Sequence, residues 1–471
     1  MAEEALSASH QEKGEPAEAP PEQIRKAVAG AAMGNCIEWY DFGVFGFMPA
    51  ILGQVFFNAS STSEGALATF AVLAITFIVR PFGSFVFGPL GDKIGRQKVL
   101  ALTIILMSGS TFIIGLLPSY ATIGPAAAVL LILLRTIQGF SAGGEYGGAA
   151  TFIAEYAPAR RRGFWGSWLE FGTLVGFAMG AGFVTIFTVV LGDEAMREWG
   201  WRLPFLIAGP LGIVGLYLRN KLEDTPLFQE IEKKNQVEKS PLKALLKKHW
   251  TSILHLIGIV VMLNVADYIV ITYLETYLKD VVGFSGHAPL LIILATIALM
   301  LVLIVPIGML SDRIGRKPIL IASCASFLVL PIPAFSLMGA AADDQNGWQL
   351  TLGVLMIAVP LVLILAVLAA TLPAMFPTQE RYGGFSIGYS VSTAAFGGTA
   401  SYVIGSLVNS TGDTLWPAYY LMGSAAIAAI PILLLPETAG VSLRRIVSSR
   451  IIRRRKPEPA TPGGASELPA S

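Results

Sequence analysis

Two carboxylates, Glu38 and Asp41, lie in the apolar stretch GNCIEWYDFGVFGF, which covers residues 34–47. A charged residue in the middle of a membrane costs about 2.5–3.5 kcal/mol on insertion scales, so such a position calls for a functional explanation. At a spacing of i, i+3 the two acids share a helix face, and they repel one another unless one is protonated or a cation is near. This pattern predicts a site that loads and releases a proton.

Two arginines can supply the neighbouring cation. Arg80 lies near the middle of the second apolar segment, and Arg135 lies just outside the middle of the fourth. Burial and like-charge repulsion favour the neutral form of a carboxyl group, whereas a nearby guanidinium favours the charged form, and this balance suits proton exchange. These two arginines and the two acids, Glu38 and Asp41, are our candidate proton-coupling residues. The alternative for each is a static buried ion pair that fixes helix packing.

Aromatic and polar residues near these depths are candidates for binding a substrate. Asp267, near the middle of the seventh apolar segment, either tunes substrate choice or hydrogen-bonds to a neighbouring helix. Aromatic rings that share a cavity can hold a quaternary ammonium by cation–π attraction worth about 2 kcal/mol when desolvated. Taken singly, each ring is more typical of packing or of an interfacial belt. The candidates are Trp39, Tyr40, Tyr146, Asn264, Asp267 and Tyr268.

The elements that must position these residues are membrane helices. The chain has 54% hydrophobic and 14% charged residues and a mean hydropathy of +0.64, whereas a soluble domain has about 25% charged residues. Strict alternation of the kind found in membrane β-barrels is absent, so we expect an all-α bundle. Blocks long enough to span occur about twelve times, at residues 28–56, 66–91, 98–118, 124–154, 163–191, 201–219, 251–281, 288–311, 318–340, 350–376, 383–409 and 415–436.

An internal repeat divides the chain into two six-helix halves. The stretch GPLGDKIGRQK, from Gly88, recurs as GMLSDRIGRK, from Gly308, at an offset of 308 − 88 = 220 residues. Pro158 in EYAPARRRG and Pro377 in MFPTQERYGG agree, since 377 − 158 = 219. The predicted domains are a disordered cytoplasmic tail at 1–27, an N-terminal half at 28–219, a cytoplasmic linker at 220–250, a C-terminal half at 251–437 and a second cytoplasmic tail at 438–471.

Lys and Arg concentrate in alternate connections, which predicts that these connections and both termini face the cytoplasm. The first residues, 1–24, are polar and contain no apolar core, so we expect no cleavable signal peptide. The protein is therefore expected in the plasma membrane as a multi-pass monomer. The second tail begins with seven cations, which we expect to contact anionic lipid: Arg444, Arg445, Arg450, Arg453, Arg454, Arg455 and Lys456.

The repeated loop predicts a gate between the halves. Asp92 can pair with Arg96, as Asp312 can with Arg316, although a generic positive loop is the alternative. Glu145 and Glu170 lie toward the same ends of their spans, near a triple-arginine turn, and either form gating ion pairs or contact substrate. The candidate gating residues are Gly88, Asp92, Gly95, Arg96, Glu145, Arg160, Arg161, Arg162, Glu170, Asp312, Gly315 and Arg316.

The repeated motif GxLxDxxGR resembles the loop motif of the major facilitator superfamily, and the likeness extends over nearly the whole chain. The blocks GNCIEWYDFGVFGF, QGFSAGGEYGGAATFIAEYAPARRRGFWGSWLEFG, EWGWRLPF, LEDTPLF and LPAMFPT resemble its metabolite:proton symporter branch. Within that branch the chain is most similar to proline/glycine betaine proton symporters. The resemblance implies a twelve-span bundle that moves a solute with protons by alternating access.

Glycines at the small-xxx-small spacing lie on spans five and eleven, which are matching helices of the two halves. They are Gly172, Gly176 and Gly180 on the first and Gly383, Gly384 and Gly388 on the second. This spacing allows helices to approach closely, either so that they slide or so that they pack statically.

Enzyme activity is not expected, because the four histidines are scattered and no nucleotide loop, metal spacing or nucleophile elbow is present. No cofactor and no nucleic acid partner is implied. Three functions stay open: a proton symporter of proline or a betaine, a proton symporter of an organic anion such as 2-oxoglutarate, citrate or shikimate, and a transport-inactive membrane sensor.

Overall fold

The computed structural model describes residues 20–59, 62–221, 224–233, 241–284 and 288–443. Every regular element in these ranges is a helix. Ten of the helices described are long and apolar enough to cross a membrane, and there are twelve spans when each of two bent helix pairs counts as one. The all-α, twelve-span bundle predicted from the sequence is confirmed.

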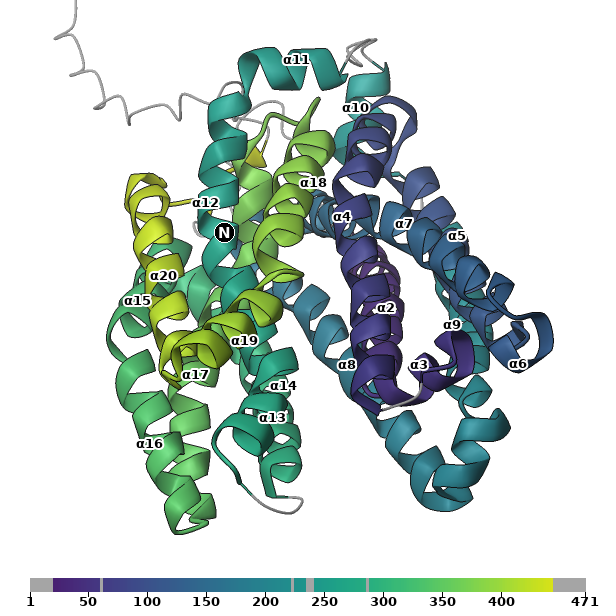
Figure 1. Cartoon of the computed structure of the whole chain (residues 1–471). Coiled ribbons are helices and arrows are strands. Elements are labelled where there is room, and N and C mark those ends of the chain that lie inside the picture. Colours follow the sequence, from purple (N-terminus) through teal and green to yellow (C-terminus); the bar gives the residue numbers. More distant parts are fainter. Residues whose placement is uncertain (1–19, 60–61, 222–223, 234–240, 285–287, 444–471) are drawn as a thin grey trace, which may run out of the picture.

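The first half of the bundle is drawn in purple and blue in Figure 1. It comprises α2 (Pro21–Gly46), α3 (Pro49–Phe57), α4 (Thr62–Ile94), α5 (Arg96–Leu116), α6 (Tyr120–Ile123), α7 (Ala126–Tyr156), η1 (Ala159–Arg161), α8 (Arg162–Ala195), η2 (Met196–Gly200) and α9 (Arg202–Asn220). Two short helices follow, α10 (Pro226–Lys233) and α11 (Pro241–Lys248). They lie across one end of the bundle, which we call the linker end (Figure 1).

The second half, in teal, green and yellow, lies beside the first (Figure 1). It comprises α12 (Trp250–Asp267), η3 (Tyr268–Tyr273), α13 (Leu274–Thr276), η4 (Tyr277–Val281), α14 (Ala288–Ile314), α15 (Arg316–Val329), α16 (Pro331–Asp343), α17 (Gly347–Thr371), η5 (Leu372–Met375), α18 (Arg381–Ser392), η6 (Thr393–Gly397), α19 (Ala400–Thr411) and α20 (Trp416–Leu434).

Two of the predicted spans are sharply bent. The span predicted at 28–56 turns by 75° between α2 and α3, and the span predicted at 318–340 turns by 52° between α15 and α16. Pro49 and Pro331 each stand at the start of the second helix of the pair. Proline has no N–H to donate and its ring clashes with the preceding turn, so a new helix begins at each of these residues.

The element boundaries differ from the predicted domain limits at the N-terminus. Helix α2 begins at Pro21, so residues 21–27 are helical, which corrects the disordered tail predicted for residues 1–27. Residues 1–19 lie outside the described residues. Helices α10 and α11 occupy the segment predicted as the linker between the halves.

Glycine allows α2 and α8 to pack backbone against backbone. A Cβ atom added at Gly176 would lie 2.1 Å from the carbonyl oxygen of Cys36 on α2. Gly172 and Gly180 face the carbonyl oxygens of Ala32 and Tyr40, which lie one turn to either side of Cys36 on α2. Because no side chain fits between these backbones, the glycine stripe fixes α2, which carries Glu38 and Asp41, against α8.

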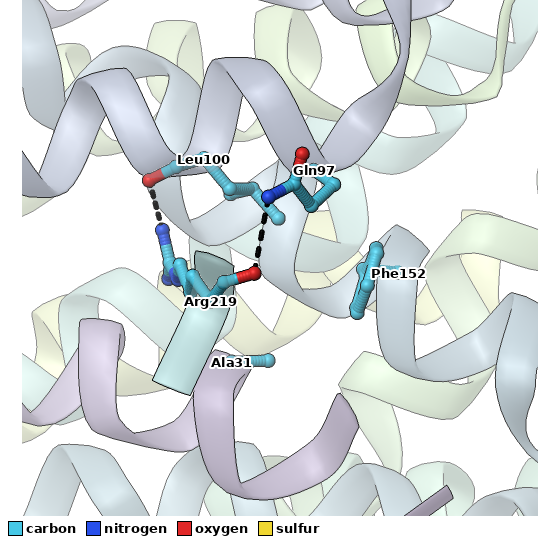
Figure 2. Close-up of a pocket in the computed structure, with 5 residues that line it drawn as sticks. All are labelled: Ala31, Gln97, Leu100, Phe152 and Arg219. Atoms are coloured by element: carbon cyan, nitrogen blue, oxygen red, sulfur yellow. Dashed lines mark hydrogen bonds between the residues drawn. The ribbon is translucent and has the colours of Figure 1, made fainter. Parts of the chain in front are cut away.

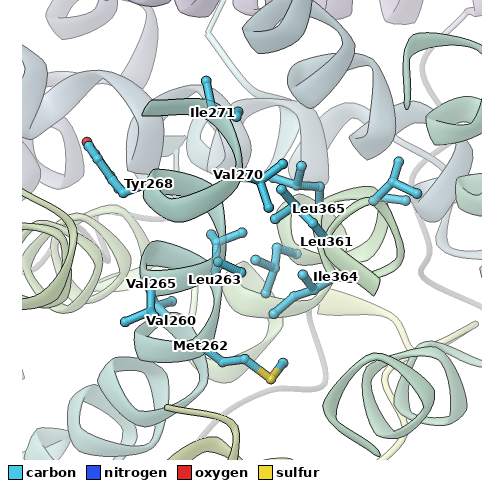
Figure 3. Packing of buried hydrophobic residues seen from close by; sticks show 14 of the residues in the cluster. Val260, Met262, Leu263, Val265, Tyr268, Val270, Ile271, Leu361, Ile364 and Leu365 are labelled. Carbon is cyan, nitrogen blue, oxygen red and sulfur yellow. The ribbon is translucent and has the colours of Figure 1, made fainter. Parts of the chain in front are cut away.

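Apolar side chains of α12 and α17 contribute to the core of the second half. Side chains that include Leu263 and Val265 on α12 and Leu361 and Leu365 on α17 are buried together (Figure 3). Van der Waals contacts of this kind drive helix association in lipid, where the hydrophobic effect between helices is absent. The shared core holds α12, which ends at Asp267, in a fixed place within its half.

We predict that Gly176→Ala lowers the thermal midpoint of the purified protein and slows transport, because overpacking of a tight contact costs about 1–3 kcal/mol. Gly182→Ala is the matched control, since Gly182 lies on the same helix and nothing approaches its added Cβ within 4 Å. Thermal unfolding in detergent and uptake in liposomes measure both. Equal midpoints for the two variants would contradict backbone packing at the stripe.

Candidate functional site

Glu38 on α2 forms a buried ion pair with Arg80 on α4. The Arg80 guanidinium also lies over the rings of Phe42 and Phe77, at 5.4 and 5.6 Å from their centroids. Phe77 meets Tyr268 of the second half edge to face, with ring centroids 5.3 Å apart. The pair is therefore enclosed by aromatic rings and lies beside the interface between the halves.

Asp41, one turn further along α2, has a different cation. Nη1 of Arg135 lies 2.5 Å from its Oδ2 atom, and Oδ1 accepts hydrogen bonds of 3.0 Å from both Gln138 and Thr111. The Arg135 guanidinium stacks over the Phe45 ring at 3.5 Å from its centroid. The acids therefore do not share one cation. One helix turn carries two separate acid–arginine pairs, which offset the repulsion between the carboxylates.

Glu145 is held within the first half. It pairs with Arg219, at the end of α9, and accepts a hydrogen bond from Thr103 on α5. The arginine that pairs with Glu145 therefore comes from a helix distant in sequence and not from the turn at 160–162. The contact is an ion pair inside one half, so it does not act between the halves.

The triple-arginine turn has one buried member. Arg160 and Arg161, in η1, are exposed. Arg162 is buried and donates hydrogen bonds of 3.1 Å to the carbonyl oxygens of Ala154 and Val441. Of the three, Arg162 is the residue placed to hold the halves together at the linker end.

Glu170 on α8 contacts a hydroxyl group instead of a cation. It accepts a hydrogen bond from Tyr146 on α7, in contrast to the gating ion pair predicted. The Tyr146 ring stacks on Tyr389 of the second half, with centroids 4.1 Å apart and planes inclined by 21°. Tyr389 was missed from the sequence, although the repeat offset points to it, because 170 + 219 = 389.

The second half supplies Asn264 and Asp267 from α12. Asn264 is engaged with its own half, since it donates to Ser392 at 3.2 Å and accepts from Thr393 at 3.1 Å. Asp267 is buried, and its Oδ1 atom has no hydrogen-bond partner within the described part of the chain. Tyr268, the next residue, is the aromatic contact of Phe77 across the interface.

The two aromatic residues that follow Glu38, Trp39 and Tyr40, point in different directions. The Trp39 ring packs on Phe42, with centroids 5.7 Å apart, and belongs to the core shared by both halves. Tyr40 lies in the core of the first half alone, where its hydroxyl donates to the carbonyl oxygen of Pro204 at 2.6 Å. Tyr40 is therefore a packing residue, which corrects its assignment to substrate binding.

At the linker end, Asp92 reaches across to the second half. Its carboxylate accepts hydrogen bonds from the backbone N–H groups of Gly383, at 2.8 Å, and Tyr382, at 3.3 Å. Both are first-turn groups of α18, which have no acceptor within their own helix and form the positive end of its dipole. Arg96 lies 3.2 Å from the same carboxylate.

Asp312 makes the equivalent contact in the opposite direction. Its carboxylate accepts from the backbone N–H groups of Gly163, at 2.7 Å, and Phe164, at 2.8 Å, in the first turn of α8. Arg316 lies 3.6 Å away. We call Asp92, Asp312 and the helix starts that they contact the linker-end latch. Each contact stabilises the closed arrangement by about 0.3–2 kcal/mol, which substrate binding can overcome.

Glycine is required in both copies of the loop. Gly95 and Gly315 have φ angles of +109° and +100°, which residues with a side chain rarely adopt. A Cβ atom at Gly95 would also lie 1.9 Å from Oδ2 of Asp224, and one at Gly315 would lie 2.4 Å from Oε2 of Glu437. These acids accept the first N–H groups of α5 and α15, so each half repeats the same turn and cap.

Glu155, in the AEYAP block, connects the latch to the linker. It lies 3.5 Å from Arg96 and 2.8 Å from Arg381, and it accepts a 2.5 Å hydrogen bond from Thr225. Sequence reasoning missed it, although it lies three residues before Pro158 of the repeated turn. Burial raises the pKa of Asp224, in the connection after α9, above its ordinary value.

A small pocket lies elsewhere, among helices of the first half (Figure 2). Gln97 donates to the carbonyl oxygen of Arg219 at 3.0 Å on its wall. Its lining residues are Ala31, Gln97, Leu100, Phe152 and Arg219. Since all five come from one half, the pocket is not the place where the halves meet.

The comparisons with known proteins agree with this architecture. The family described as sugar (and other) transporter matches residues 27–249 and, a second time, residues 229–448, so each half carries one match. The chain belongs to the major facilitator superfamily. It is a multi-pass membrane transporter and not an enzyme.

Relatives of this transporter are similar over most of their length. The proline/betaine transporter of Salmonella typhimurium is 45% identical over 90% of this chain and 85% of its own. The glycine betaine/proline/ectoine/pipecolic acid transporter OusA of Dickeya dadantii has the same identity and coverage. The solved structure of the proton:xylose symporter XylE matches with a TM-score of 0.71 at 18% identity, over 90% of this chain and 98% of that one.

We predict that Asp92→Asn slows transport more than Asp312→Asn does. Asp92 is the more deeply buried and joins the network of Arg96, Glu155 and Arg381, whereas Asp312 lies beside Arg316. An amide has no charge to offer the positive helix end, so each variant should also open the linker end, measured by labelling of single cysteines placed there. Wild-type rates and labelling in both variants would exclude a latch.

Proposed function

We propose that this transporter imports a small zwitterionic osmolyte of the proline or glycine betaine type together with protons. It acts as a monomer in the plasma membrane, with the linker end and both termini in the cytoplasm. The names of relatives that are 45% identical support this substrate class. The concentration of Lys and Arg at the linker end supports the orientation.

The observation that carries the proposal is the pair of acid–arginine contacts on one turn of α2. In the conformation described, Glu38 holds Arg80 and Asp41 holds Arg135. Protonation of Glu38 removes its charge and frees the Arg80 guanidinium, which can then bind the carboxylate of the substrate through two parallel hydrogen bonds. Proton loading and solute binding are thereby coupled at one residue pair.

The direction of access follows from the linker-end latch. With Asp92 and Asp312 on the helix starts of the opposite halves, the cytoplasmic side is closed. Substrate and proton are then loaded from outside. Release of both latch contacts opens the cytoplasmic side and completes one cycle of alternating access.

Symport of an organic anion is the second candidate, and the contacts disfavour it. That function requires both Arg80 and Arg135 to leave the acids that they hold and bind substrate carboxylates, whereas the single carboxylate of a zwitterion requires only Arg80 to be freed. Uptake in proteoliposomes with an imposed proton gradient separates the candidates, with labelled proline in competition with betaine, ectoine, 2-oxoglutarate and shikimate. Competition by 2-oxoglutarate, and not by betaine or ectoine, would overturn our proposal. The absence of any uptake would favour a membrane sensor.

We predict that Glu38→Gln and Asp41→Asn each abolish accumulation driven by a proton gradient, because neither amide can exchange a proton. At least one of the two variants should retain exchange of solute without net proton movement. Glu22→Gln is the control on the same helix, since Glu22 forms an exposed pair with Lys26. Wild-type accumulation ratios in both variants would remove the proton-coupling role.

The basic tail, Arg444 to Lys456, lies outside the described residues, and its contact with anionic lipid stays part of the proposal. We expect truncation after Leu443 to reduce the dependence of transport on anionic lipid and on salt, because each cation near a negative surface contributes about 1 kcal/mol before screening. The carbonyl oxygen of Leu443 still accepts from Arg381 at 3.1 Å, so the bundle should keep this anchor. Unchanged lipid and salt dependence in liposomes would reduce the tail to a topological signal.

A further inference from the structure

The internal repeat extends to α2 and α12, the first long helix of each half. Asn35 on α2 donates hydrogen bonds to Thr173 and to the carbonyl oxygen of Leu169 on α8, the latter at 3.2 Å. Asn264 on α12 donates to Ser392 on α18, also at 3.2 Å. Since 392 − 173 = 219, the two hydroxyl acceptors occupy the same position in the repeat. The two asparagines are therefore equivalent residues of the two halves.

This equivalence makes Asp267 the counterpart of Glu38. Each acid lies three residues after its asparagine, and each is followed by an aromatic residue, Trp39 or Tyr268. The offset agrees for both pairs, since 264 − 35 = 229 and 267 − 38 = 229. Both acids are buried. Each half therefore places one carboxyl group at the same position of its first long helix.

The cation that pairs with Glu38 has no counterpart in the second half. The repeat offset of the loop places Met300 on α14 at the position of Arg80 on α4, because 80 + 220 = 300. Met300 is buried, and its thioether carries no charge. Within the described part of the chain Asp267 has no ion pair, and its Oδ1 atom has no hydrogen-bond partner. The second half thus keeps the acid and lacks the arginine.

The titratable groups that interact electrostatically with Asp267 do not replace this arginine. One is Tyr268, the next residue, whose ring contacts Phe77 of the first half. The others among the described residues are Tyr146, Tyr389 and Glu170. None of them is a cation, so a charge on Asp267 faces only neutral or acidic groups.

A buried carboxylate without a counter-charge is strongly unfavourable, and such a group becomes neutral by binding a proton. We propose that Asp267 is a proton-binding site of the second half and holds a proton while the linker end is closed. The inference rests on the alternation between closed and open states in the proposed function. The two equivalent acids differ in their need for a proton: Glu38 requires one to release Arg80, whereas Asp267 requires one to stay buried.

A proton at Asp267 also shifts the equilibrium between the two states. Opening of the linker end lets water reach the interface between the halves, where an ionised carboxylate is much less unfavourable. The closed state therefore binds the proton more tightly than the open state does. By linkage, a lower pH favours the closed state and a higher pH favours the open state.

The test measures the separation of the halves at the linker end as a function of pH. Lys93, at the end of α4, and Arg313, at the end of α14, are exposed and are equivalent in the repeat, since 93 + 220 = 313. Spin labels on Lys93→Cys and Arg313→Cys report the distance between the halves in the purified full chain. From acid to alkaline buffer the open-to-closed ratio should rise by at least about tenfold, a change of about 1.4 kcal/mol.

The Asp267→Asn variant is neutral at every pH, as protonated Asp267 is, so it should stay closed and lose this response. Asp267→Glu, which can bind a proton, should retain it. Glu275→Gln is the control further along the same bent span, because Glu275 pairs with Lys279, and it should respond as the wild type does. Loss of the response in Asp267→Asn, together with retention in both other variants, would support the proton site.

Other outcomes would overturn the inference. A wild type whose label distances do not change with pH would do so without reference to the folding of any variant, and so would a full response in Asp267→Asn. Weaker betaine binding in Asp267→Asn with an unchanged pH response would show that Asp267 holds the substrate cation instead of a proton. The proposed function is tested separately by uptake, because a wild type that transports neither proline nor betaine can still show the pH response.

Discussion

A carboxylate buried in an apolar medium has to meet a counter-charge, a proton or a dipole, and the arrangement of this bundle follows from that requirement. Arg80, Arg135 and Arg219 come from three different helices, and each reaches a single acid of the first half. The pairs therefore restrict the relative rotation of α2, α4, α7 and α9. Among the described residues, Glu170 meets the hydroxyl of Tyr146 instead of a cation, and Oδ1 of Asp267 has no hydrogen-bond partner.

The same requirement is met differently at the linker end. There the acids of the repeated loops are satisfied by backbone dipoles of the opposite half, and the cations of the loops lie beside them. The duplication extends to detail, because Arg162 and Arg381 stand at matching helix starts with 381 − 162 = 219. Reciprocal acid–dipole contacts and the Glu155–Arg381 ion pair join the halves at this end, while the ion pairs of Glu38, Asp41 and Glu145 lie within the first half.

Sequence reasoning recovered the features that depend on local composition. Hydropathy gave the twelve spans, the repeat gave the two halves, and the cost of buried charge singled out Glu38 and Asp41 in advance. The partners of the acids did not follow, because Glu145 meets an arginine 74 residues away, and the reach of a side chain across a bundle is set by packing. Tyr389 was missed for a different reason, since a neutral ring in an apolar span carries no charge to mark it.

The latch has a consequence for how the two halves can diverge over time. The carboxylates of Asp92 and Asp312 accept hydrogen bonds from backbone N–H groups, which every amino acid except proline supplies. The helix starts themselves have little room for a side chain, since a Cβ atom at Gly163 would lie 2.5 Å from the carbonyl oxygen of Gly308 and one at Gly383 would lie 3.2 Å from Oδ2 of Asp92. Both sides of the latch are therefore constrained in residue type, the accepting loops by the carboxylate and the donating helix starts by the lack of space, so the halves can diverge freely only away from this end.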